Sequence, residues 1–264
     1  MARAPQRVTF TGSLGSALAG RLDLPAGPPR AYALFAHCFT CSKNLDDLRL
    51  AAACLRDNLS APQLLIGHSL GGAAVLAVAA DLPEVNAVVT IGAPADVGHI
   101  TRLFGPQLPV IEQQGRAIVE IAGRSFTIRR ELLDDLSAHS IEERVSGLHA
   151  ALLVVHSPID NTVGIDNAAR IYAAARHPKS FLSIPGADHL LTRASDAVYA
   201  ARVVGSWADR FLVDEHQSAP APAPTAPVVV AETGQGTFLN HVVVGQHRFL
   251  ADEPVDVGGF DAGP

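Results

Sequence analysis

QLLIGHSLGGAAV, residues 63–75, joins a strand pattern to a helix pattern around a single serine. The apolar run before the serine is typical of a buried strand, and the small residues after it favour a closely packed helix. The central GHSLG (67–71) matches G-x-S-x-G, in which the serine occupies a strained strand-to-helix turn. Flanking glycines are needed because side chains there would keep the strand and the helix apart. The stretch predicts Ser69 as an exposed nucleophile and the Leu70 N–H as a donor to an oxyanion, against the alternative of an incidental serine in a Gly-rich turn.

A serine nucleophile needs a base, and the base needs an acid that orients it. Asp160 follows the strand pattern ALLVVHSP (151–158), and His189 follows the next strand pattern, in the order Ser, acid, His. A capping carboxylate and a surface histidine are the alternative interpretations of these two residues. Asp188 is a weaker candidate for the acid, because a side chain adjacent to a histidine in sequence cannot easily reach its Nδ1. Asp166 is better interpreted as a helix N-cap.

The second oxyanion donor should come from the loop after AYALFAHCF (31–39). There the N–H of Phe39 is the candidate. Cys38 and Cys41 in the same loop have C-x-x-C spacing, which also allows a redox pair. A thioredoxin-like pair should open a helix of its own βαβ unit, and no further cysteine or histidine pair completes a zinc site. Packing around the loop is therefore the preferred interpretation of these cysteines, and no metal is expected.

Composition limits the classes of protein to which these motifs can belong. The chain has 264 residues, 48% of them hydrophobic, with a mean hydropathy of +0.22, so it can bury a large core in one main domain. A net charge of −6 argues against nucleic acid or an anionic membrane as a partner, since both require clustered Lys and Arg. No apolar stretch is long enough to span a membrane and the N-terminus lacks a signal-peptide pattern, so a cytoplasmic location is expected. Three cysteines make no disulfide framework in a chain of this length.

Strand and helix patterns alternate along most of the chain, which predicts an α/β fold with a mostly parallel sheet. An opening hairpin is expected at 7–12 and 17–25, strands at 31–39, 63–69, 86–94, 151–158 and 179–189, and helices at 45–58, 70–82, 167–176 and 195–212. The strand 31–39 is almost continuously apolar, as expected of a strand buried on both faces.

Three segments depart from this alternation. Residues 97–148 contain helical patterns around a hairpin, AIVEIAGRSFTIRR (117–130), and are expected to form a cap over the sheet edge. The Pro/Ala run at 215–227 is expected to be an extended linker. Residues 228–264 offer two or three short alternating strands, which are marginal alone and are expected to remain unpaired or disordered.

These motifs together resemble a known family. AYALFAHCFTCSKN, LLIGHSLGGAAVLA, TIGAPAD, IDNAARIYAAARHPKSF and ADHLLT resemble the α/β-hydrolase half of bacterial two-domain proteins in which that half precedes an OsmC-like domain. AETGQGTFLNHVVVGQHRFLADEPVDVGG resembles the opening strands of the OsmC-like domain. The resemblance implies a three-layer α/β-hydrolase domain at 1–214, a linker at 215–227 and truncated OsmC-like strands at 228–264. It also implies a serine hydrolase that uses Ser69, Asp160 and His189.

The chain differs from that family in two places. The family has a helix, a strand and a second helix between the strands at 31–39 and 63–69, whereas the residues from Thr40 to Gln63 hold only one helix. This apparent internal deletion removes one central strand and one helix. The opening hairpin must then dock on the strand at 31–39 or leave that strand as an edge. One face of the sheet is left bare, which favours a destabilised protein, a homodimer formed through that face, or a rearranged fold. In the family, peroxide reduction depends on cysteines beyond the segment present here; residues 228–264 contain none, so that activity is not expected.

Two classes of function follow from these observations. The first is a cofactor-independent hydrolase that acts on an ester or thioester of a small molecule through Ser69, His189 and Asp160, with Leu70 and Phe39 as oxyanion donors. The second is a non-catalytic remnant or binding module. The G-x-S-x-G turn favours the first, and the missing strand favours the second.

Overall fold

The computed structural model describes residues 3–37, 45–96, 105–121, 124–137, 140–213, 228–245 and 247–263. The chain divides into two compact units. The larger unit comprises Phe10–Ala17 and Tyr32–Leu212, and the smaller one comprises Met1–Thr9, Leu18–Ala31 and Val213–Pro264. The candidate site residues Ser69, Asp160 and His189 all belong to the larger unit.

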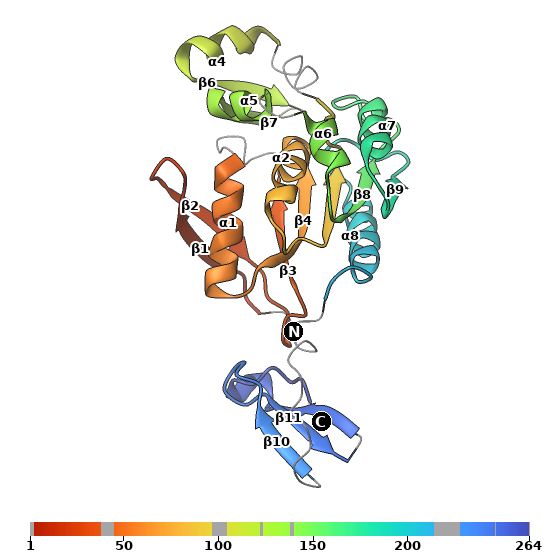
Figure 1. The fold of residues 1–264 in the computed structure, drawn as a ribbon. Coiled ribbons are helices and arrows are strands. Elements are labelled where there is room, and N and C mark those ends of the chain that lie inside the picture. The colour runs from red at the N-terminus through yellow and green to blue at the C-terminus, as the bar shows by residue number, and fades with distance from the viewer. Residues whose placement is uncertain are drawn as a thin grey trace. The chain divides into compact units, whose positions relative to one another are not determined.

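A five-stranded parallel sheet forms the centre of the larger unit (Figure 1). Its strands lie in the order β3 (Tyr32–Ala36), β4 (Pro62–His68), β5 (Ala87–Ile91), β8 (Ala151–His156) and β9 (Lys179–Ser183). The α/β fold with a mainly parallel sheet, predicted from the alternating patterns, is confirmed. Because the strands are parallel, their carboxyl ends meet at one edge, where loops from distant parts of the sequence come together.

Helices cover both faces of this sheet, so the fold has three layers (Figure 1). Leu65 of β4 and Leu152 of β8 lie in the core on one face, and Leu64 and Leu153 lie in the core on the other. The first face is covered by α1 (Leu45–Asn58), α2 (Leu70–Val78), α6 (Ile141–Ser146) and α7 (Ile165–Ala174), and the second by α8 (Ala194–Ala208). A short 3-10 helix, Ala79–Asp81, extends α2.

The described part of the segment between β5 and α6 lies next to α2 (Figure 1). It contains a 3-10 helix (Gly105–Gln107), α4 (Leu108–Gln114), β6 (Arg116–Ile121), β7 (Arg124–Arg129) and α5 (Arg130–Ser137). The strands β6 and β7 pair antiparallel, which confirms the predicted hairpin, although its turn at 122–123 lies outside the described residues. Ile111, Val119 and Ile128 are buried in the same core as α2. The cap is therefore part of the larger unit.

The strand β3 corrects one prediction. It is an edge strand, and its Phe35 side chain is 50% exposed, so it is not buried on both faces. The single helix α1 connects β3 to β4, and the two strands pair directly, as the short connection predicts. Since α1 and α2 both lie on the first face, no described helix covers Phe35 on the second. The opening strands β1 (Gln6–Thr11) and β2 (Ala17–Leu22) form a separate two-stranded sheet and do not extend the sheet at β3.

Residues 228–263 form a small sheet in the smaller unit. Its strands β10 (Val228–Glu232), β11 (Asn240–Val244) and β12 (His247–Ala251) pair antiparallel, and a 3-10 helix follows at Val255–Val257. The expectation that this segment remains unpaired is therefore wrong. Leu239, which precedes β11, and Val242 and Val243 within β11 are buried, and because successive strand residues point to opposite faces, the two valines bury apolar side chains on both faces of the sheet. The predicted linker at 215–227 lies outside the described residues. No helix in the described ranges is both long and apolar enough to cross a membrane.

Candidate active site

Ser69 lies in a strained turn between β4 and α2. Its backbone adopts φ 55° and ψ −125°, a conformation that residues other than glycine rarely adopt. A Cβ at Gly67 would collide with the backbone of Gly71 and Gly72, and a Cβ at Gly71 would collide with the Ala36 carbonyl at the end of β3. The glycines therefore allow β4 and α2 to meet, as the G-x-S-x-G pattern predicts, and also allow α2 to meet the end of β3, which was not predicted.

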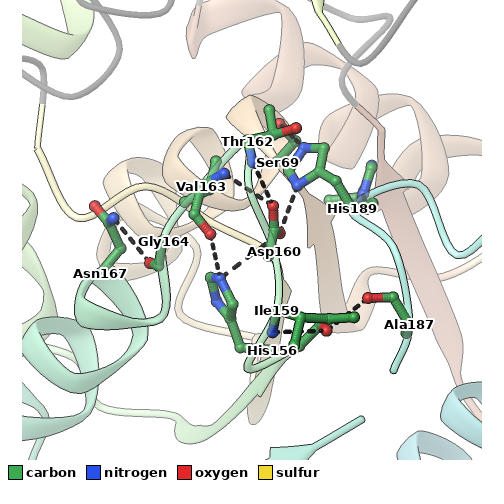
Figure 2. Close-up of polar contacts among 12 residues, drawn as sticks. Ser69, His156, Ile159, Asp160, Thr162, Val163, Gly164, Asn167, Ala187 and His189 are labelled. Atoms are coloured by element: carbon green, nitrogen blue, oxygen red, sulfur yellow. Dashed lines mark hydrogen bonds and ion pairs between the residues drawn. The ribbon is translucent and has the colours of Figure 1, made fainter. Parts of the chain in front are cut away.

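The structure brings the side chains of Ser69, His189 and Asp160 together (Figure 2). His189 Nδ1 lies 2.7 Å from Asp160 Oδ2, and His189 Nε2 lies 3.0 Å from Ser69 Oγ. Because an ionised carboxylate only accepts hydrogen bonds, Nδ1–H donates to Asp160 and the lone pair of Nε2 is left for the Ser69 hydroxyl. All three residues are buried, and Ser69 is only 1% exposed, so the prediction of an exposed nucleophile is wrong: its turn is enclosed between β4, α2 and the end of β3. This chain of hydrogen bonds has the arrangement in which a histidine can take a proton from a serine.

Asp160 is held as a carboxylate by its surroundings. Its Oδ1 accepts hydrogen bonds from the N–H groups of Thr162 at 2.8 Å and Val163 at 2.9 Å (Figure 2). Burial alone would raise the pKa of Asp160, but the hydrogen bond and charge of His189 and these two N–H groups outweigh burial and lower it. Asp160 therefore stays ionised and can stabilise a positive charge that develops on His189.

The aspartates Asp188 and Asp166 lie elsewhere. Asp188 is exposed and accepts hydrogen bonds from the N–H and the hydroxyl of Thr192, so it does not face the ring of His189. Asp166 lies in the first turn of α7, whose N-cap is Gly164. The interpretation of Asp166 as the N-cap is wrong because the helix begins earlier than its apolar pattern.

Of the two predicted oxyanion donors, one can be placed. Leu70 is the first residue of α2, and its N–H has no hydrogen-bond acceptor among the described residues. Such an N–H at a helix N-terminus can donate to an anion. Phe39, Cys38 and Cys41 lie outside the described residues. Within the described ranges, no group of three His, Cys, Asp or Glu side chains could hold a metal ion.

Two further links connect the loops around the candidate site. Ser157 Oγ donates to the Ala187 carbonyl at 2.6 Å, which joins the loop after β8 to the loop after β9. Asn167 in α7 accepts from the Ala95 N–H at 3.0 Å and donates to the Gly164 carbonyl, which joins α7 to the loop after β5. Both side chains are buried, and neither was predicted. The only signal for Ser157 was its place directly after a buried apolar strand, and no local signal marked Asn167, which lies in the first turn of α7.

His68, the residue before Ser69, contacts the loop that carries His189. Its Nε2 lies 2.8 Å from the His189 carbonyl, so this nitrogen carries a hydrogen and donates it. The two imidazole rings lie 5.1 Å apart. Burial lowers the pKa of His68 to about 4, and the hydrogen bond to His189 offsets only part of this effect. His68 is therefore neutral at physiological pH and acts as a fixed donor.

This lowered pKa predicts a loss of stability in acid. The ordinary pKa of 6.5 lies above the folded-state value of about 4, so the unfolded state binds more protons between these limits. The contribution of neutral His68 to the free energy of unfolding is thus fully present above pH 6.5. It is lost as the pH falls toward 4, by up to about 2–3 kcal/mol. His68→Gln keeps an N–H donor without this titration. We expect urea unfolding to show a smaller loss of stability between about pH 7.5 and about pH 4.5 for this variant than for the wild type.

The exposed His149 provides a control for this measurement. His149→Gln makes the same substitution at an exposed histidine and so controls for the general effect of replacing histidine by glutamine. Equal losses of stability in His68→Gln and the wild type would show that protonation of His68 does not cause the loss of stability in acid. The contribution of Asp160 is distinguishable, because a carboxylate with a lowered pKa loses its stabilising effect only at more acidic pH.

The comparisons with known proteins agree with this geometry. A family profile for the alpha/beta hydrolase fold matches residues 32–129. The esterase domain of a Rhodothermus marinus protein, known from a crystal structure, has 44% sequence identity to this chain and a TM-score of 0.74. The match covers 80% of this chain and 100% of that domain's chain. This chain belongs to the α/β-hydrolase family. Among curated proteins, none matches it.

Other solved structures share the fold at much lower sequence identity. Est1E from Butyrivibrio proteoclasticus is 16% identical, with a TM-score of 0.60, over 77% of this α/β hydrolase and 98% of its own chain. The α/β hydrolase GrgF from Penicillium sp. sh18 is 14% identical, with a TM-score of 0.60, over 80% and 99% of the two chains. At these identities the likeness concerns the fold alone.

Proposed function

We propose that this α/β hydrolase is a serine esterase that acts on an ester or thioester of a small molecule. The observation that carries the proposal is the hydrogen-bonded chain from Ser69 through His189 to Asp160 at a G-x-S-x-G turn. The likeness to a solved esterase domain at 44% identity supports the ester class. No cofactor is needed for this chemistry.

In the proposed mechanism, Ser69 Oγ attacks the acyl carbon while its proton passes to His189 Nε2, 3.0 Å away. The carbonyl oxygen becomes an oxyanion that accepts from the Leu70 N–H and, as a second donor, the Phe39 N–H. His189 then protonates the leaving alcohol or thiol, and the acyl group remains on Ser69.

Water completes the cycle in the same geometry. His189 takes a proton from water, the resulting hydroxide attacks the acyl carbon, and the proton returns to Ser69 Oγ as the carboxylic acid leaves. Throughout these steps the Asp160 carboxylate holds the imidazole and stabilises its protonated form.

The experiment is a substrate series with purified protein. We expect hydrolysis of short-chain p-nitrophenyl esters, and no detectable hydrolysis of p-nitroanilides with the same acyl groups, because the anilide leaving group is poorer. Near-UV circular dichroism should show that the same preparation is folded. Folded protein that hydrolyses none of these esters would favour the non-catalytic binding module instead.

A further inference from the structure

His156 is buried directly next to the candidate acid and has no place in the mechanism above. It is the last residue of β8 and is 1% exposed. Its Nε2 lies 2.8 Å from the Val163 carbonyl and 3.7 Å from Asp160 Oδ2 (Figure 2). Its Nδ1 is buried and has no hydrogen-bond partner in the described part of the chain.

These contacts assign the hydrogen on the ring. A carbonyl oxygen only accepts, so Nε2 must carry a hydrogen and donate it to Val163. A second hydrogen on Nδ1 would be a buried donor without an acceptor, which costs about 1–3 kcal/mol. His156 is therefore suited to holding one hydrogen bond in place and not to carrying protons to and from a substrate.

The bond from His156 completes the support of Asp160. Val163 is bound through both of its backbone groups, because its N–H donates to Asp160 Oδ1 and its carbonyl accepts from His156. Asp160 and Val163 close a tight turn, and His156 lies beneath that turn (Figure 2). Without the His156 donor, the buried Val163 carbonyl would lose its partner, and the turn would have to move to find another.

We infer that His156 is a positioning residue of the proposed esterase: it fixes the turn 160–163, and so holds the Asp160 carboxylate against His189 Nδ1. The inference rests on the proposed function. It differs from a role in packing alone, since only the donor at the Nε2 position matters to the alignment. A displacement of the acid by about 1 Å can lower turnover about 100-fold while substrate binding is kept.

Three substitutions separate the donor from the bulk of the ring. His156→Leu keeps volume and removes the donor. His156→Gln can place an amide N–H near the position of Nε2, whereas the shorter side chain of His156→Asn reaches only the position of Nδ1. Leu152 lies on the same face of β8 as His156 but farther from the site. Leu152→Val removes one methylene group there and serves as the control for altered packing.

Turnover is measured with a p-nitrophenyl ester and expressed per active site, counted by end-point titration with a fluorophosphonate. We expect His156→Leu and His156→Asn to lower kcat about 10- to 100-fold with KM changed less than about twofold. His156→Gln should recover most of the lost kcat, and Leu152→Val should stay near the wild type per active site.

Wild-type kcat per site in His156→Leu, or equal kcat in the Gln and Asn variants, would overturn the inference. If His156→Leu does not fold, the comparison of the Gln and Asn variants decides, because both are polar. A folded wild type without turnover would contradict the proposed function itself, whereas an active wild type with unaffected His156 variants contradicts only the role of His156.

Discussion

We expect Ser69→Ala to lower kcat for ester hydrolysis about 10⁴- to 10⁶-fold. The variant lacks the Oγ that attacks the acyl carbon in the proposed mechanism and that lies 3.0 Å from His189 Nε2. The measurement is steady-state hydrolysis of a p-nitrophenyl ester by wild type and variant at equal concentration. His189→Ala should lose a similar amount, because the serine and its base act as a unit.

The fold of Ser69→Ala should survive, since the substitution removes one atom and keeps a Cβ in the strained turn. Its thermal unfolding and near-UV circular dichroism should therefore match the wild type. A folded Ser69→Ala variant that keeps a tenth or more of the wild-type kcat would show that another group does the chemistry.

Asp160→Asn should lower kcat about 10⁴-fold through the tautomer of His189. The amide oxygen can keep the two hydrogen bonds from Thr162 and Val163, which leaves the amide NH₂ facing His189 Nδ1. Nδ1 must then accept, so the ring hydrogen moves to Nε2, and Nε2 can no longer take the proton of Ser69. Steady-state kcat should fall strongly while KM changes little.

Asp188→Asn is the matched control, because Asp188 is the residue before His189 but contacts Thr192 at the surface. It should keep kcat within about twofold of the wild type, as expected of a surface substitution away from the reacting groups. If Asp188→Asn is the variant that loses activity and Asp160→Asn is not, the acid has been assigned to the wrong aspartate.

The fold was largely predictable from the sequence because its strands and helices alternate with distinct patterns. The helix α1 has the predicted bounds Leu45–Asn58, and the hairpin of β6 and β7 lies where its alternation indicates. The exposure of Phe35 was not predictable from the pattern of β3. An apolar strand has the same composition at an edge as in the centre of a sheet, and its burial depends on helices that the local sequence does not contain.

The candidate site also combines features that the local sequence predicts with features that depend on tertiary neighbours. Ser69, Asp160 and His189 each follow a strand pattern, and parallel strands bring such loops to one edge, so their proximity could be predicted. The partners of His68 and His156 could not, because a histidine next to an apolar strand is compatible with many tertiary neighbours. Hydrogen bonds such as that from His68 to the His189 carbonyl join residues far apart in sequence, and they become visible only once the loops are placed.

In the proposed mechanism Ser69 is activated by His189 and Asp160, and covalent labelling by a fluorophosphonate tests this activation most directly. Intact mass should show one adduct per chain, peptide mapping should place it on Ser69, and it should be absent from Ser69→Ala and strongly slowed in His189→Ala. Folded wild-type protein that takes up no label, or is labelled at a residue other than Ser69, would contradict the account.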